Sequence, residues 1–96
     1  FRREGKNLVC DVQVGFGTAA LGGQAEVPTL DGSATINIPP GTPSGQRFRL
    51  KGRGVPSRNG SVSGDLLAVI QIAPPTKLDA RSRELLEEFT RLNPGP

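Results

Sequence analysis

The chain of 96 residues has no histidine, and it has a single cysteine, Cys10. Without histidine it lacks the commonest general base, the base of the usual serine or cysteine triads, and the commonest metal ligand. A single cysteine excludes an internal disulfide and any zinc site built from a cysteine cluster. The carboxylates are scattered except in the C-terminal segment. We therefore expect no catalysis, no metal site and no cofactor.

Long apolar runs are also missing, because no stretch approaches the roughly 18 consecutive apolar residues that cross a membrane. We expect no membrane association. One cysteine without histidine fits a reducing compartment, so we expect a cytoplasmic protein. Only 34% of the residues are hydrophobic, and the four aromatic residues are all phenylalanine. These figures predict one domain with a thin aliphatic core.

Glycine and proline are abundant, with 13 and 9 residues respectively. This composition favours short strands joined by turns. Apolar and polar residues alternate with a period of two in the predicted strands, which cover residues 7–14, 24–28, 34–38, 46–51 and 65–72. The pair Asp31-Gly32 predicts a hairpin turn between the second and third of these. The last strand is apolar on both faces, which indicates a central position in a sheet.

Two helical segments are expected. Residues 15–23 interrupt the first strand and predict one helical turn, with Thr18 as its N-cap and Gly22 as its end. Residues 79–92 predict a helix with Asp79 as its N-cap. Its apolar residues form one stripe, Leu78, Leu85, Phe89 and Leu92. The stripe either docks on the sheet or pairs with a second copy of the chain.

A basic stretch follows the third turn and contains no acidic residue. It comprises Arg47, Arg49, Lys51, Arg53 and Arg58. One interpretation is an electrostatic contact surface for nucleic acid or an acidic peptide. The other, which we favour, is a solvated strand face that keeps a sheet edge soluble. No aromatic side chain shares that face, although nucleic-acid binders usually add aromatics for stacking.

Three single residues have alternative interpretations. Cys10 is in line with Leu8 and Val12, so we expect it in the core. Phe16 lies between two glycines, and it either plugs the open end of the sheet or lines a shallow apolar groove for an extended peptide. Asp65 follows a glycine, and we expect it to close a loop through backbone hydrogen bonds.

Several stretches resemble the second C-terminal β-domain of DnaJ-type co-chaperones, the J-domain proteins. The matching stretches are Phe1 with Gly5 and Leu8, AALG at 19–22, VPTLDG at 27–32, IPPGTPSG at 38–45, LKGRGVP at 50–56, GDL at 64–66 and the closing helix. No single stretch is diagnostic, but together they cover nearly the whole chain in the family's order.

The resemblance implies a mainly all-β fold, a small β-sandwich of short strands with one short helical turn and a C-terminal helix. It implies a client-binding domain over residues 1–76 and a possible dimerisation element over residues 77–93. In the family such domains form homodimers through the C-terminal end, hold unfolded client proteins and help deliver them to a DnaK-type chaperone. The His-Pro-Asp triplet that stimulates that partner lies in a separate domain, and this chain has no histidine.

These considerations nominate three sets of residues. The peptide-binding candidates are Val14, Phe16 and Leu21, and the dimerisation candidates are Leu85, Leu86, Phe89 and Leu92. The alternative hypothesis is a DNA-binding module, similar to curved-DNA-binding relatives, that acts through Arg47, Arg49, Lys51 and Arg53. A third hypothesis is a structural spacer without a ligand.

Overall fold

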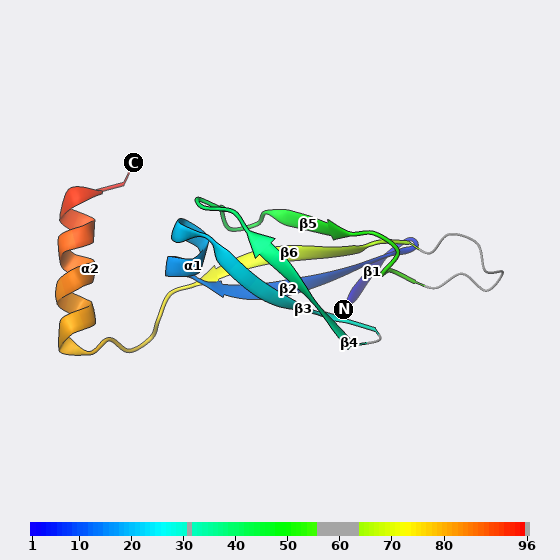
Figure 1. The fold of residues 1–96 in the computed structure, drawn as a ribbon, viewed down its shortest axis with the longest axis horizontal. Helices are drawn as coiled ribbons and strands as arrows, with labels where there is room; N and C mark the ends of the chain where they lie inside the picture. The colour runs from blue at the N-terminus through cyan, green and yellow to red at the C-terminus, as the bar shows by residue number, and fades with distance from the viewer. Residues whose placement is uncertain (31, 56–63, 96) are drawn as a thin grey trace.

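The computed structural model describes residues 1–30, 32–55 and 64–95, which form two β-sheets and two helices (Figure 1). Thus Asp31 of the predicted turn and Arg58 of the basic stretch lie outside the described residues. A four-stranded sheet has the order β1 (Arg2–Glu4), β2 (Asn7–Gly15), β6 (Leu66–Ala73) and β5 (Arg47–Leu50). A two-stranded sheet consists of β3 (Gly23–Thr29) and β4 (Gly32–Ile38). The helices are α1 (Phe16–Leu21) and α2 (Ala80–Leu92).

The central strand β6 lies between β2 and β5. It pairs in parallel with β2, from Leu8 opposite Leu66 to Gly15 opposite Ala73, and antiparallel with β5. Its first five residues are all buried. The prediction of a central strand at 65–72 is therefore confirmed, and two prolines end the strand after Ala73.

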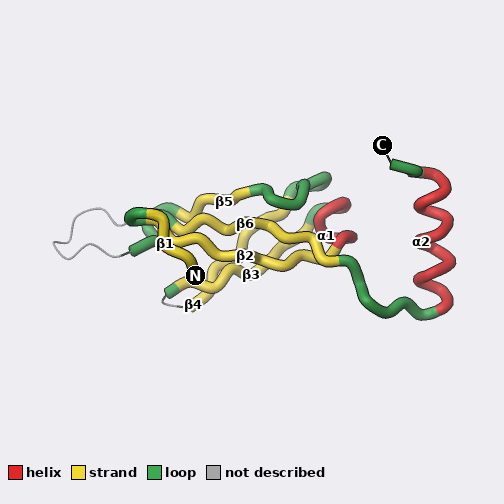
Figure 2. Tube along the Cα trace, turned by 180° about the vertical axis from the view of Figure 1, so that it is seen from behind, coloured by secondary structure: helices red, strands yellow, loops and turns green. Residues whose placement is uncertain are grey.

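The β3–β4 hairpin covers one face of the larger sheet and completes a small sandwich (Figures 1 and 2). Because side chains alternate along a strand, Val27 and Ile38 of the hairpin point inward and belong to the same core cluster as Leu66 and Ile70 of the sheet. Val27, Leu66 and Ile70 are completely buried. Polar side chains such as Gln24 and Asn37 point outward and bond to one another. The expected mainly-β fold is confirmed.

The opposite face of the larger sheet holds a second apolar cluster, Val9, Leu67 and Val69, all buried. The register places Arg2 beside Val9, Arg49 beside Leu67 and Arg47 beside Val69. Long arginine stems cover apolar surface while their charged ends stay in water. The arginines of β5 therefore have a packing role on this face.

The first helix differs from its prediction. Its N-cap is Gly15, and Thr18 lies inside the helix, where its carbonyl accepts a hydrogen bond from the Gly22 N–H at 2.8 Å. The Thr18 cap is wrong because the helix starts directly where β2 ends. The end at Gly22 is confirmed, and its positive φ of 91° suits glycine.

The second helix follows its prediction closely. The Asp79 carboxylate accepts a hydrogen bond from the Ser82 N–H at 2.7 Å, and this bond lowers the pKa of Asp79. The chain leaves the helix at Asn93. Three ion pairs within the helix join Arg81 to Glu84, Arg83 to Glu87 and Arg91 to Glu88. No residue of α2 is buried.

Two glycines allow three backbone segments to meet at the end of the sheet far from α2. The Gly54 N–H donates to the Gly64 carbonyl at 2.8 Å, and the Val55 N–H donates to the Lys6 carbonyl at 3.0 Å. A Cβ atom on Gly64 would overlap the Lys6 carbonyl, so backbone would have to shift. Glycine at position 64 is thus required by close packing.

We predict that Gly64→Ala lowers the free energy of unfolding by about 1–3 kcal/mol, because overpacking displaces backbone. The control is Gly17→Ala, since nothing lies within 4 Å of a Cβ at this helical position. That change should be neutral or stabilise by up to about 1 kcal/mol. Urea denaturation measures both. Equal stability of the two variants would contradict the packing role of Gly64.

Candidate functional site

One side of β2 is open over much of its length. β1 pairs only with Asn7–Val9, and within the described residues no strand pairs with this side of β2 from Cys10 onward. The Leu8 N–H donates to the Asp65 carbonyl on the β6 side at 2.9 Å. Because backbone groups alternate along a strand, those of Asp11, Gln13 and Gly15 point to the open side. We call this stretch the β2 edge.

Exposed apolar side chains lie at the far end of the β2 edge. α1 continues directly from β2, and its residues Phe16 and Leu21 are 46% and 81% exposed. Large exposed apolar side chains grouped on one element are typical of contact surfaces. The strand edge therefore ends at an apolar surface.

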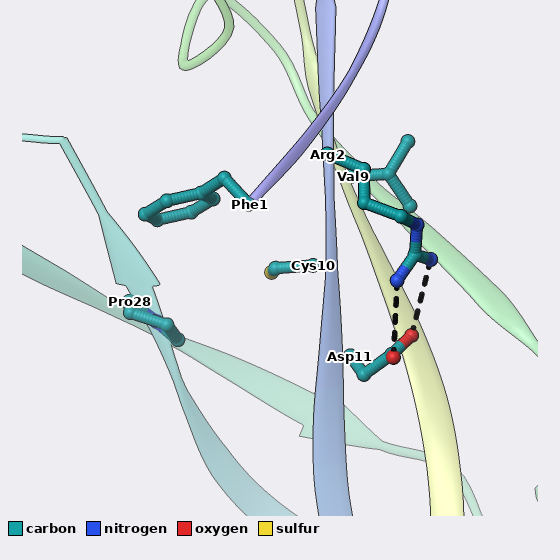
Figure 3. Close-up of a pocket in the computed structure, with 6 residues that line it drawn as sticks. All are labelled: Phe1, Arg2, Val9, Cys10, Asp11 and Pro28. Carbon is teal, nitrogen blue, oxygen red and sulfur yellow. Dashed lines mark hydrogen bonds and ion pairs between the residues drawn. The ribbon is translucent and has the colours of Figure 1, made fainter.

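A shallow cavity of about 280 Å³ lies at the near end of the β2 edge. It is lined by Phe1, Arg2, Val9, Cys10, Asp11 and Pro28. Figure 3 shows Phe1 and Pro28 on one side of Cys10 and the Arg2–Asp11 ion pair on the other. The Arg2 guanidinium, 3.1 Å from Asp11, holds the pKa of that carboxyl below its usual range. The cavity thus has one apolar wall and one paired, charged wall.

The peptide-binding candidates are placed differently from one another. Phe16 and Leu21 lie at the surface, but Val14 is part of the core and is only 5% exposed. Its side chain therefore does not line a surface groove. Sequence reasoning missed the edge-facing residues Asp11 and Gln13, although their polar side chains alternate with the buried ones and could have indicated them.

Cys10 lies in the core, as predicted, although it also borders the cavity. Burial raises the pKa of its thiol, so the thiol is protonated at neutral pH. A protonated and mostly covered thiol is a poor nucleophile. Among the described residues, no group of three or more cysteine, aspartate or glutamate side chains could hold a metal ion.

The dimerisation candidates form a continuous apolar surface on α2. Leu85, Leu86, Phe89 and Leu92 are all exposed. α2 stands beyond the α1 end of the sandwich (Figures 1 and 2). Its contact there includes an edge-to-face pair of Phe89 and Phe16, with ring centroids 5.8 Å apart. One intramolecular ring pair leaves most of the stripe uncovered.

The basic residues divide into two groups. Arg47 and Arg49 lie on the outer face of β5, and Lys51 and Arg53 lie in the turn that follows. Arg49 Nη1 is 2.6 Å from Asp65 Oδ2, and the Gly52 N–H donates to Asp65 Oδ1 at 3.0 Å. The Gly52 bond and then the Arg49 bond lower the pKa of Asp65. Asp65 closes its loop as expected, and it neutralises part of the basic surface.

The fold and these surfaces define a small mainly-β domain with a C-terminal amphipathic helix. In the described part of the chain, no helix is long and apolar enough to cross a membrane.

The model of the "DnaJ C terminal domain" family matches residues 1–75. The chain is also similar to "Chaperone protein DnaJ" of Neisseria meningitidis serogroup C / serotype 2a, with 47% identity over 95 residues. That match covers 99% of this chain and 26% of the relative's length. The chain therefore belongs to the DnaJ C-terminal domain family, and the predicted resemblance to a DnaJ-type chaperone is confirmed.

We predict that Asp65→Asn lowers the melting temperature at pH 7, because the Arg49 and Gly52 bonds favour the carboxylate. The folded-state pKa is lowered, so this stabilisation is present above the unfolded pKa of about 3.9 and disappears as pH falls through the folded pKa. The difference in melting temperature between wild type and Asp65→Asn should therefore disappear in acid.

Thermal unfolding from pH 7 to about pH 2.5 checks this prediction. Glu26→Gln is the control, since Glu26 is exposed on the hairpin, and it should leave the melting temperature nearly unchanged. A gap for Asp65→Asn that stays constant at all pH values would show that the charge is not responsible.

Proposed function

We propose that this chain is the client-binding and self-association part of a DnaJ-type co-chaperone. In this proposal an extended segment of an unfolded protein adds as a strand along the β2 edge. The supporting observation is the open side of β2, which presents the backbone groups of Asp11, Gln13 and Gly15 between a cavity and an apolar helix end.

Strand addition explains how one site could hold clients of many different sequences. Main-chain hydrogen bonds provide affinity for any extended sequence, and pockets for alternate side chains provide selectivity. Here the cavity at Phe1 and Pro28 and the surface at Phe16 and Leu21 lie at the two ends of the β2 edge. The apolar wall of the cavity and the exposed Phe16 and Leu21 side chains suit the hydrophobic segments that unfolded proteins expose.

We also propose that residues 1–76 hold the client and residues 77–93 form a homodimer. Each α2 has an exposed apolar stripe, and its three acidic and three basic residues from Arg81 to Arg91 balance one another. Two such helices can approach without net repulsion, and an isologous contact would cover both stripes. Delivery of clients to a DnaK-type chaperone in the cytoplasm would use the rest of the parent protein.

Nucleic-acid binding is not part of this proposal. Arg49 is already paired with Asp65, and the neighbouring aromatic Phe48 points to the opposite face of the sheet, toward the core. Phe48 therefore offers no base-stacking surface on the basic face.

We predict that Leu21→Ser weakens binding of a permanently unfolded fluorescent client by about three- to tenfold, because apolar contact area is lost. The matched control is Leu30→Ser, which alters another exposed leucine in the β3–β4 connection. On binding, the amides of Asp11 and Gln13 should exchange more slowly with solvent. Fluorescence anisotropy and residue-resolved hydrogen exchange provide the two measurements.

Equal effects of the two leucine changes, or unprotected Asp11 and Gln13 amides at saturation, would contradict a site at the β2 edge.

We predict that Phe89→Asp converts a dimer of this chain into a monomer, because it places a charge in the centre of the apolar stripe. Ala80→Asp adds the same charge in the first turn of α2, away from the stripe, and should leave the dimer intact. Sedimentation equilibrium over a range of concentrations measures the mass. A wild-type chain that remains monomeric at the highest concentrations would refute self-association through α2.

A further inference from the structure

A second strand edge lies on the other side of the molecule, along β5. Among the described strands, β5 is the last of the four-stranded sheet and pairs with β6 alone. The Gly45 N–H donates to the Ile70 carbonyl at 2.7 Å, and the Ile70 N–H donates to the Gln46 carbonyl at 2.8 Å. Because the Gln46 carbonyl faces β6 and backbone groups alternate along a strand, the backbone groups of Phe48 and Leu50 also face β6. Those of Arg47 and Arg49 face the open side.

The charged side chains beside the β5 edge lie on one face of the sheet. Arg47 and Arg49 have side chains on the outer face of the sheet, and Lys51 follows in the turn. The side chains of Phe48 and Leu50 are on the inner face, where they are partly buried at the margin of the core. The β5 edge therefore offers backbone groups flanked by positive charge on one side and by apolar surface on the other.

We propose that the β5 edge binds an acidic, extended peptide segment in which acidic and apolar residues alternate. Residues of an added strand that lie directly opposite Arg47 and Arg49 project to the outer face, where carboxylates would meet the guanidinium groups. The intervening residues project to the inner face, where Phe48 and Leu50 offer apolar contacts.

Charge selects this occupant over a second copy of the chain. Antiparallel pairing of two β5 edges would place arginine opposite arginine, which is destabilising. The nearby carboxylate, Asp65, already bonds to Arg49 and to the Gly52 N–H, so it lowers the positive charge without cancelling that of Arg47 and Lys51. The β5 edge thus repels itself and attracts a negative strand.

The experiment titrates the 96-residue chain with a short labelled peptide in which glutamate alternates with valine. Two comparison peptides have glutamine in place of glutamate, or the same composition with the glutamates consecutive. We expect the alternating acidic peptide to bind most tightly. We expect Arg47→Gln to weaken its binding by about two- to fivefold, the effect of one cross-strand charge pair. Lys77→Gln removes the same charge between β6 and α2 and should have little effect.

Residue-resolved hydrogen exchange at saturation locates the peptide. Protection of the Arg47 and Arg49 amides supports strand addition at β5. Binding that depends on charge but protects neither amide would overturn the proposal, as would equal affinity for the alternating and consecutive peptides. Short duplex DNA is the last competitor. The proposal would also be overturned, in favour of nucleic acid, if DNA bound more strongly than the peptide, lost affinity with Arg47→Gln and left the Arg47 and Arg49 amides unprotected.

Discussion

The pairing of β6 on both of its sides is the constraint on which the rest of the structure depends. β6 is apolar on both faces, so it is stable only in the middle of a sheet with both faces covered. β2 occupies one side in parallel and β5 occupies the other antiparallel. Since β1 is short, this order leaves two exposed stretches of strand edge on opposite sides of the sheet, one along β2 and one along β5.

The two faces of β6 are covered by different means. The β3–β4 hairpin covers the inner face with aliphatic side chains. On the outer face the register sets Arg2, Arg49 and Arg47 beside Val9, Leu67 and Val69, where arginine stems can cover apolar surface. A positively charged outer face is thus a consequence of how a small chain covers a second apolar surface. The same arginines remain able to meet an acidic ligand, because their charged ends stay at the surface.

Local patterns predicted most elements of this fold. Alternation located β2, β5 and β6, and Asp79 marked the start of α2, because these signals depend on neighbouring residues. The order β1-β2-β6-β5 could not be read from the sequence, since it joins segments more than fifty residues apart. The β2 edge depends on that order, so Gln13 was missed. Val14 was misplaced although it alternates in phase with the buried Cys10 and Val12, so the period of β2 already indicated the core.

The contact between Phe16 and Phe89 connects the two proposed activities. Phe16 begins α1 at the end of the β2 edge, and Phe89 lies in the middle of the α2 stripe. A client segment that reaches Phe16 would meet a ring that α2 already contacts, and a dimer that recruits Phe89 would release that ring. An aromatic pair contributes about 0.5–1.5 kcal/mol, so coupling through this contact would change either affinity by about two- to twelvefold. If the chain acts as proposed, dimerisation would then adjust client affinity by a limited factor without switching client binding on or off.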